Sequence, residues 1–357
     1  MIFYLIGWLR TSKHSPLPVL TPNTKVSIII AARNEEENIG NCILSLLQQD
    51  YPRELFEIIA IDDHSQDKTL SVMKSIKSAQ LKILQLPVDE TNSYKKAAIN
   101  YGILQAFGDL IIMTDADCIA ENRWLSTIVS YYEKHRPVMI AGPVALINES
   151  GWLEKWQSLD LCGMMVITAG AITNGFPNMC NGGNLAYEKK AFTDVGGFKG
   201  IDKLPGGDDV MLMMKFTKEY PRKVHFLKSK EAIVFTQPVR TFSDLIQQRL
   251  RWLSKGTAFP DWRVSAVLIF SWLFNLSIII NFFGGFFWKE LWEVAGLAFV
   301  VKTFFDLLIL WSGCSFFGKN KLLWNILPAQ VLHILYVAIL GGMSRFSKFK
   351  WKERVYP

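Results

Sequence analysis

The 357-residue chain has few charged residues for its length. Asp, Glu, Lys and Arg make up only 20% of it, whereas 50% is hydrophobic and the mean hydropathy is +0.17. This composition excludes an ordinary soluble domain. The apolar excess is concentrated in residues 264–343, and the part before them has a normal globular composition. The length allows a sizeable core and more than one structural region.

Cysteines are scarce and widely spaced. No pair has the spacing of zinc ligands, which argues against a zinc or disulfide framework, and free thiols fit a reducing, cytoplasmic setting. The five positions are Cys42, Cys118, Cys162, Cys180 and Cys314. No cleavage-site pattern follows the apolar start, which ends at Arg10 and is too short to span a bilayer. A clipped transmembrane helix and an interfacial anchor both remain open for this start.

The sequence also lacks an arginine-rich tract and any nucleic-acid-binding motif, so its net charge of +7 does not indicate a nucleic-acid partner. Basic residues lie near the apolar segments instead, as Arg249, Arg251, Lys255 and Arg263 do. This placement favours anionic lipid head groups and a donor that carries a diphosphate.

Strand and helix patterns alternate through the first 120 residues. Runs rich in β-branched residues predict strands over 25–32, 56–61, 81–86 and 109–114, with helices over 39–47, 67–76 and 95–107. The alternation predicts an α/β fold with a doubly wound, mainly parallel sheet. Ligands bind such sheets beyond the carboxyl ends of the strands.

The second half is less regular and ends in apolar stretches. It predicts a strand over 138–147, helices over 152–172 and 208–219, and an amphipathic helix over 242–256 in the plane of the bilayer interface. Stretches 264–288, 291–311 and 322–340 each approach the ~20 residues that cross a bilayer. The predicted division is an anchor and linker (1–24), a catalytic domain (25–241), an interface helix (242–263), transmembrane helices (264–343) and a basic tail (344–357).

Asp115 and Asp117 flank Ala116 at the end of an apolar run. In an extended segment, residues two apart point the same way, so both carboxylates would reach one Mg²⁺ or Mn²⁺, which in turn neutralises a diphosphate. A solvated turn is the alternative, because Asp-x-Asp alone is common. The strand context and the other acidic pairs favour the metal site.

Two further acidic pairs follow the same logic. Asp62 and Asp63 end a predicted strand, where a carboxylate can accept hydrogen bonds from a nucleotide; a helix N-cap cluster is the alternative, and the two are compatible. Asp208 and Asp209 begin an apolar helix after two glycines. One carboxylate of such a pair can serve as a general base, although capping is the better interpretation of this pair alone.

Gln248, Arg251 and Trp252 lie within five residues. Arg can hold a leaving diphosphate, Gln can hydrogen-bond it and Trp can stack on a sugar, whereas basic and Trp anchors of an interfacial helix are the alternative. Lys302 and Asp306 are four residues apart in an apolar stretch, where they can pair. Intramembrane charges are functional candidates, and a structural pair between helices is at least as good an interpretation.

Together these motifs resemble a membrane-associated family 2 glycosyltransferase with a GT-A fold. The resemblance runs from Val26 to Trp252 and is specific as a combination. It rests on the segments Ala31-Ala32-Arg33-Asn34-Glu35, Asp62-Asp63-His64-Ser65, Lys96-Ala97-Ala98-Ile99-Asn100, Thr114-Asp115-Ala116-Asp117, Asn181-Gly182-Gly183-Asn184, Gly207-Asp208-Asp209 and Gln248-Arg249-Leu250-Arg251-Trp252. The last motif is shared with cellulose, hyaluronan, poly-N-acetylglucosamine and ceramide glucosyl synthases.

The resemblance implies inversion at the anomeric carbon and a nucleoside-diphosphate sugar donor, a UDP-sugar before others. Donor binding would fall to Asp62, Asp63, Lys96, Asp115, Gln248, Arg251 and Trp252, with Asp115 and Asp117 at the metal. Asp209, beside Asp208, would be the base that deprotonates the acceptor hydroxyl.

The chain departs from the cellulose-synthase-like members in two ways. It has fewer apolar segments, and its loop reads Cys180-Asn181-Gly182-Gly183-Asn184 where those enzymes have an aromatic-Cys-Gly-Ser sequence. Single transfer to a lipid or envelope-glycan acceptor is therefore preferred over processive polysaccharide synthesis. A catalytically idle scaffold in an envelope assembly complex is a third hypothesis, and a transporter is improbable without pairs of broken helices.

The expected protein is integral to the bacterial cytoplasmic (inner) membrane, with its catalytic domain in the cytoplasm. A third crossing would put Arg345, Lys348, Lys350, Lys352 and Arg354 outside, against the positive-inside rule. We therefore expect a cytoplasmic tail, and a re-entrant or interfacial segment at either 291–311 or 322–340.

Overall fold

The computed structural model describes residues 1–15, 22–87, 94–202, 206–253, 259–343, 349–351 and 354–356. The chain divides into two compact units, and each is described by itself. One comprises Met1–Leu5, Asn148–Val166 and Pro238–Pro357, and we call it the helical unit. The other comprises Ile6–Ile147 and Ile167–Gln237, and we call it the sheet unit.

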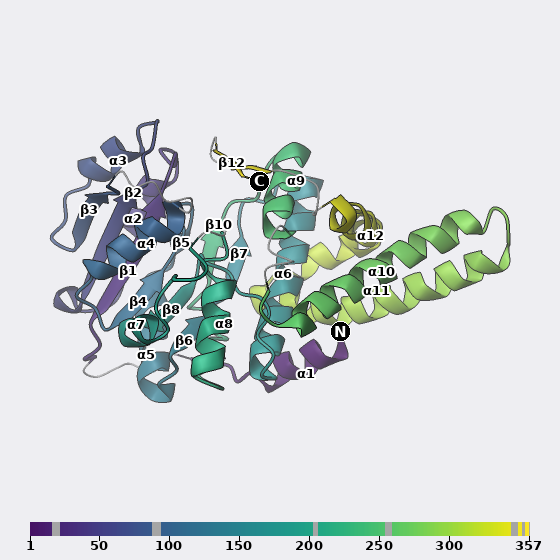
Figure 1. The fold of residues 1–357 in the computed structure, drawn as a ribbon, viewed down its shortest axis with the longest axis horizontal. Coiled ribbons are helices and arrows are strands. Elements are labelled where there is room, and N and C mark those ends of the chain that lie inside the picture. Colours follow the sequence, from purple (N-terminus) through teal and green to yellow (C-terminus); the bar gives the residue numbers. More distant parts are fainter. Residues whose placement is uncertain are drawn as a thin grey trace. The chain divides into compact units, whose positions relative to one another are not determined.

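The sheet unit is built on a seven-stranded sheet of order β3-β2-β1-β4-β8-β6-β9 (Figure 1). Neighbours are parallel except where β8 pairs antiparallel with β4 and β6. The strands are β1 (Val26–Ala32), β2 (Phe56–Asp62), β3 (Leu81–Gln85), β4 (Leu110–Met113), β6 (Met139–Ala141), β8 (Leu185–Glu188) and β9 (Val224–Phe226). The predicted α/β class and mainly parallel sheet are confirmed.

Successive side chains of the central strands point to opposite faces of this sheet, and helices bury them on both faces. Ile28 and Ile30 of β1 face the core that α2 (Ile39–Leu47), α3 (Thr69–Ser75) and α5 (Trp124–His135) cover. Ile29 faces the other side, where α4 (Tyr94–Leu104) packs; a Cβ at Gly102 of α4 would lie 3.1 Å from Ile29 Cγ2. Helices on both faces explain why β1 reads as an uninterrupted apolar run.

Several elements of this unit were not predicted. Helix α5 and strand β8 escaped the sequence analysis, and the predicted strand 138–147 is two strands of different sheets, β6 and β7. β7 (Val144–Leu146) belongs to a three-stranded sheet with β5 (Ile119–Ala120) and β10 (Val234–Thr236). The remaining helices here are α7 (Lys189–Asp194), α8 (Val210–Glu219) and the short 3₁₀ helix Arg53–Leu55, while α1 (Ile2–Arg10) and α6 (Trp152–Thr173) have residues in both units.

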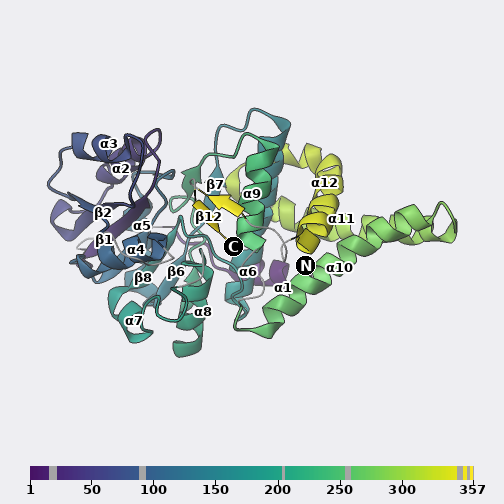
Figure 2. The ribbon, with the colours of Figure 1, turned by 45° about the horizontal axis from the view of Figure 1, so that its top comes forward.

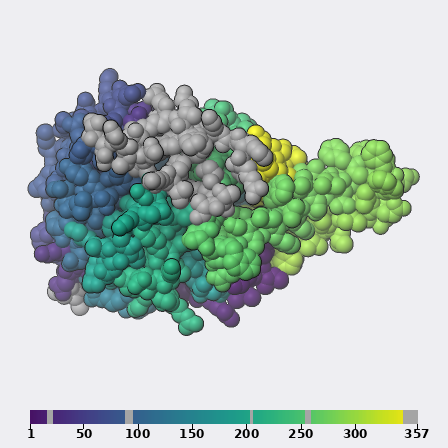
Figure 3. Space-filling view, in the orientation of Figure 1, coloured from purple at the N-terminus to yellow at the C-terminus, as the bar shows by residue number. Residues whose placement is uncertain are grey.

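The helical unit contains three helices that are long and apolar enough to cross a membrane, counted among the described residues. α10 (Trp262–Gly284) and α11 (Glu290–Phe317) run side by side (Figures 1 and 2). Phe270 and Phe282 of the first and Leu297 of the second are among their many exposed apolar side chains. Figure 3 shows atoms of these two helices, green and yellow-green, in contact with each other.

The third such helix, α12 (Ile326–Met343), lies along the amphipathic helix α9 (Phe242–Leu253). Leu245 of α9 shares an apolar cluster with Ala329, and Leu250, further along α9, shares another with Leu340. The strand β11 (Phe349–Trp351), paired with β12 (Arg354–Tyr356), also contacts α9.

Candidate active site

The Asp115–Asp117 segment is a turn that follows β4 at the carboxyl edge of the sheet. The backbone N–H of Cys118 closes it by donating to Asp115 O at 3.1 Å. The expectation of an extended segment was therefore wrong, but the turn still gathers the acids. One ligand atom each from Asp115, Asp117 and Cys118 lie within 4.8 Å of one another.

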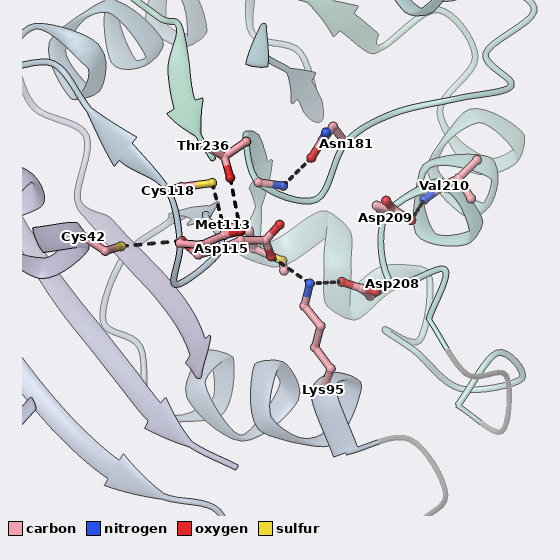
Figure 4. A network of polar contacts seen from close by, with 12 residues as sticks. Cys42, Lys95, Met113, Asp115, Cys118, Asn181, Asp208, Asp209, Val210 and Thr236 are labelled. Atoms are coloured by element: carbon pink, nitrogen blue, oxygen red, sulfur yellow. Dashed lines mark hydrogen bonds and ion pairs between the residues drawn. The ribbon is translucent and has the colours of Figure 1, made fainter. Parts of the chain in front are cut away.

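A lysine ammonium joins this turn to the second acidic pair. Lys95 Nζ lies 2.8 Å from Asp115 Oδ1 and 3.3 Å from Asp208 Oδ2 (Figure 4). Burial lowers the pKa of Lys95, but the carboxylates of Asp115 and Asp208 outweigh it and leave the pKa above its ordinary value. Lys95 is thus a fixed cation between the two acidic sets.

Two glycines shape the approach to Asp208 and Asp209. Gly206 and Gly207 both have φ of 72°, a left-handed conformation that side chains disfavour. Asp209 then caps α8, since its Oδ1 accepts a 2.7 Å hydrogen bond from Val210 N. The capping interpretation of this pair is therefore present in the structure, and Asp208 Oδ2 contacts Lys95 in the same place.

The electrostatics of the turn favour an added cation. Burial and the neighbouring charges of Asp115 and Glu35 raise the pKa of Asp117 to about 6. Thr236 Oγ1 donates to Asp117 Oδ2 at 3.1 Å and Cys118 Sγ donates to Asp117 Oδ1 at 3.6 Å, and both of these donors are neutral. Burial, then Asp117 and Asp115, hold the pKa of the Cys118 thiol well above its usual range, so the sulfur stays protonated. Two hard carboxylates and a neutral thiol suit Mg²⁺ or Mn²⁺ bound by oxygen.

The glycine-rich loop before β8 comes close to the turn. A Cβ at Gly183 would lie 3.3 Å from Asp115 Oδ2 and 3.2 Å from Cys118 Sγ, so a larger residue would crowd the carboxylate. Asn184 holds the loop, because its Nδ2 donates to Pro143 O and Ala232 O, both at 2.8 Å. Glycine at this position keeps space beside Asp115.

Asp62 and Asp63 lie at the end of β2, which β1 separates from β4. Both are buried, at 3% and 2% exposure. Asp63 Oδ1 is 3.2 Å from His64 Nδ1, and Arg33 Nη1 donates to Asp63 O at 2.8 Å. The turn after β2 is thus held by the loop after β1.

Lys96 and Lys95 have different surroundings. Lys96 is buried and its Nζ donates to Ile201 O at 2.5 Å. Its neighbour Lys95 contacts the acids and was missed by the sequence analysis. The signal was present in the sequence, since consecutive helical residues point about 100° apart and only one of two lysines can face the sheet edge.

Gln248, Arg251 and Trp252 lie on α9, in the helical unit, and each is half-buried. Arg249 is different, because it is only 2% exposed and pairs with Asp160. Arg249 is therefore not available to lipid head groups. Its position in the sequence had suggested that it was. Lys255 lies outside the described residues.

Comparison with known proteins identifies the family of residues 27–201. Residues 27–201 match the family described as Glycosyl transferase family 2. The chain is 27% identical over 233 residues to Glycosyltransferase AglE of Haloferax volcanii, covering 65% of this chain and 72% of the relative. It is 25% identical over 265 residues to the Beta-monoglucosyldiacylglycerol synthase of Synechocystis sp., covering 70% of this chain and 53% of the relative.

A solved structure shares the fold. The mannosyltransferase PcManGT from Pyrobaculum calidifontis, determined in complex with GDP-Man and Mn²⁺, superposes with a TM-score of 0.55 at 15% identity, covering 94% of each chain. The fold is accordingly of the GT-A type. Residues 27–201 form a glycosyltransferase family 2 domain.

Proposed function

We propose that this enzyme transfers a sugar, with inversion, from a nucleoside-diphosphate sugar to a lipid or envelope-glycan acceptor at the cytoplasmic face of a membrane. The observation that carries the proposal is the gathering of Asp115, Asp117, Asp208 and Asp209 about one ammonium at the carboxyl edge of the sheet. Ligands of doubly wound sheets bind at this edge.

Asp209 is the proposed base. The Asp209 carboxylate would take the proton of the acceptor hydroxyl, whose oxygen attacks the anomeric carbon as the bond to the diphosphate oxygen breaks. Attack from the side opposite the leaving group inverts the configuration. Its hydrogen bond from Val210 N supports the role, because the cap fixes the carboxylate at the helix N-terminus without supplying a proton.

The donor would lie along the remaining acids. Asp63, with Asp62, would contact the nucleoside, and Gln248, Arg251 and Trp252 would bind the diphosphate and the sugar. Lys95 is a better candidate than Lys96 for the diphosphate, because its ammonium already lies among carboxylates at the sheet edge. A UDP-sugar remains the preferred donor, and the GDP-Man complex of PcManGT makes a GDP-sugar the alternative to test.

Asp115 and Asp117 would hold a divalent cation, Mg²⁺ or Mn²⁺. When bound, the cation would offset the negative charge of the donor diphosphate. The raised pKa of Asp117 supports this assignment, since it reflects burial first and then the negative charges of Asp115 and Glu35, which a bound cation would offset.

The apolar helices support a membrane-bound acceptor. α10 and α11 expose apolar side chains over most of their length, which suits lipid surroundings. A relative that carries the name of a diacylglycerol glucosyl synthase adds to this support. We therefore propose residues 25–241 as the catalytic domain and residues 264–343 as the membrane region.

The contact of β11 with α9 bears on membrane orientation. α9 follows the catalytic domain with no apolar stretch between them, so both lie on one side of the membrane. If the tail is on that side too, the chain between α9 and β11 crosses an even number of times. α10 and α11 would cross, and α12 would lie in the interface along α9, with the tail in the cytoplasm of a bacterial cell.

Thiol labelling tests this orientation. A cysteine at Ser347, which lies outside the described residues, should resist an impermeant thiol reagent in intact spheroplasts and react after permeabilisation. A cysteine at Phe287, in the turn between α10 and α11, should react in both conditions. Efficient labelling at position 347 in intact spheroplasts would contradict the cytoplasmic tail.

A donor panel tests the activity. The detergent-solubilised full chain is given UDP- and GDP-sugars with Mn²⁺, and nucleoside diphosphate release is measured with and without a membrane lipid extract. We expect one donor to be consumed, faster with the extract, and its radiolabelled sugar to enter an organic-soluble product. A water-soluble polymer would favour processive synthesis instead, and no consumption of any donor would favour the idle scaffold.

A further inference from the structure

Arg249 is a buried cation inside the Gln-x-x-Arg-Trp motif. Its Nη2 donates to Asp160 Oδ2 of α6 at 2.7 Å, and its side chain is 3% exposed. A charge this deeply buried is tolerated when it is paired, and removing one partner leaves an uncompensated charge in an apolar environment. Asp160 therefore compensates the buried charge of Arg249.

Aromatic rings surround the same guanidinium. Its Cζ lies 4.3 Å from the ring centroid of Trp252, one turn further along α9. The rings of Trp156 on α6 and Tyr336 on α12 lie at 5.8 Å and 5.7 Å. The Nε atom has no hydrogen-bond partner among the described residues, and Nη1 lies 4.0 Å from Met164 Sδ, so the rings and this sulfur surround the rest of the guanidinium. Cation–π contacts strengthen when the cation is desolvated, as it is here.

We propose that Arg249 is a positioning residue, which fixes helix α9 and the indole of Trp252 so that the motif can receive the donor. Three helices meet at this one side chain: α9 that carries it, α6 through Asp160 and Trp156, and α12 through Tyr336. One face of the Trp252 ring is occupied by the guanidinium. The inference rests on the proposed donor-binding role of Gln248, Arg251 and Trp252.

Arg249 lies on α9, whereas other ion pairs of the helical unit do not. Lys319 and Glu149 also form a half-buried ion pair in the helical unit, but this pair lies outside α9. Glu149→Gln is therefore a matched control: it removes the carboxylate partner of a cation without disturbing the residues around Trp252. It should lower the unfolding midpoint and leave the Michaelis constant for the donor unchanged.

The test compares this control with Asp160→Asn and Arg249→Lys in the full chain, using donor kinetics and thermal unfolding in detergent. Displacing a binding group by ~1 Å can cost up to about a hundredfold, so we expect kcat/KM to fall between tenfold and a hundredfold, mainly through KM. Arg249→Lys should not rescue, because an ammonium keeps the charge but loses the planar stacking on Trp252. Equal KM values in all three variants would overturn the proposal.

A double-mutant cycle shows whether Asp160 acts through Trp252. In a Trp252→Phe background, Asp160→Asn should cost much less in kcat/KM than it does in the wild type, because residues that act as a unit are non-additive. If the kcat/KM losses of the two single variants multiply in the double variant, the positioning role is contradicted and Arg249 is a purely structural residue.

Unfolding measurements keep this inference separate from the proposed function. Should the wild type consume no donor at all, the proposed function fails, and the arrangement around Arg249 is still judged by its unfolding midpoints. Asp160→Asn and Arg249→Gln should then each lower the midpoint more than the double variant does, since each single change leaves an uncompensated buried charge and the double change leaves none. If the midpoint losses of the two single variants add in the double variant, Asp160 and Arg249 do not act as a pair, which would overturn the proposed arrangement.

Discussion

The two units handle buried charge in opposite ways. Among the described residues of the helical unit, three buried or half-buried cations have a carboxylate each: Arg249 pairs with Asp160, Lys302 with Asp306 and Lys319 with Glu149. In the sheet unit, Asp115 and Asp208 share the ammonium of Lys95, with Asp117 and Asp209 beside them. The first region is balanced and the second carries an excess of negative charge.

This difference separates structural charge from functional charge. A balanced pair satisfies itself and needs no ligand. An excess of carboxylates opposes folding until a cation arrives, so it is where ligand binding changes both stability and activity. Lys302 and Asp306 are functional candidates in the sequence because they interrupt an apolar segment, and a structural pair is at least as good an interpretation. The structure pairs them with each other and with Gln330 of α12.

The largest effect should come from Asp209→Asn. Asparagine caps a helix as well as aspartate does, so α8 should keep its N-cap on Val210 while the base is lost. We expect transfer to fall by about 10²–10⁴ with an unfolding midpoint near that of the wild type. Near-normal turnover would exclude Asp209 as the base, and a large drop in the midpoint would mean that its role is structural.

Removing divalent metal should have the next largest effect. A bound cation is worth several kcal/mol in such reactions, so EDTA should lower transfer by roughly 10²–10³ and Mn²⁺ or Mg²⁺ should restore it. Mn²⁺ at ~100 times its Kd should also stabilise the folded chain by about 2.7 kcal/mol, an effect that Asp115→Asn should weaken. Full activity after thorough chelation would remove the metal from the site.

The two adjacent lysines offer a smaller and sharper contrast. Lys95→Gln should raise the donor KM by about ten- to a hundredfold, because a hydrogen bond from a charged group is worth ~1.5–3 kcal/mol. Lys96→Gln removes the donor to Ile201 O and should mainly lower stability. Donor titrations of both variants decide between them, and a larger KM effect at Lys96 would restore the sequence-based assignment.

The sequence was most informative where local pattern and sheet geometry agree. Uninterrupted β-branched runs predict β1, β2 and β4, and parallel strands put Asp62 and Asp115 at one edge. Strand β8 was missed because its antiparallel pairing with β4 joins residues such as Ile112 and Ala186, which are far apart in the chain. Arg249 was expected at the surface because α9 is amphipathic, whereas its partner lies 89 residues away.

The smallest effect on activity should come from the balanced intramembrane pair. Lys302→Gln or Asp306→Asn alone leaves one buried charge uncompensated, at a cost of about 3–5 kcal/mol. The double variant leaves no charge, and its two amides can still hydrogen-bond Gln330, which contacts both native side chains. We expect the double variant to regain most of the stability and to transfer sugar at the wild-type rate. Unfolding midpoints and turnover of the three variants provide the check. A double variant that is folded but inactive would make this pair functional, and the contrast between balanced and excess charge would no longer separate structure from function.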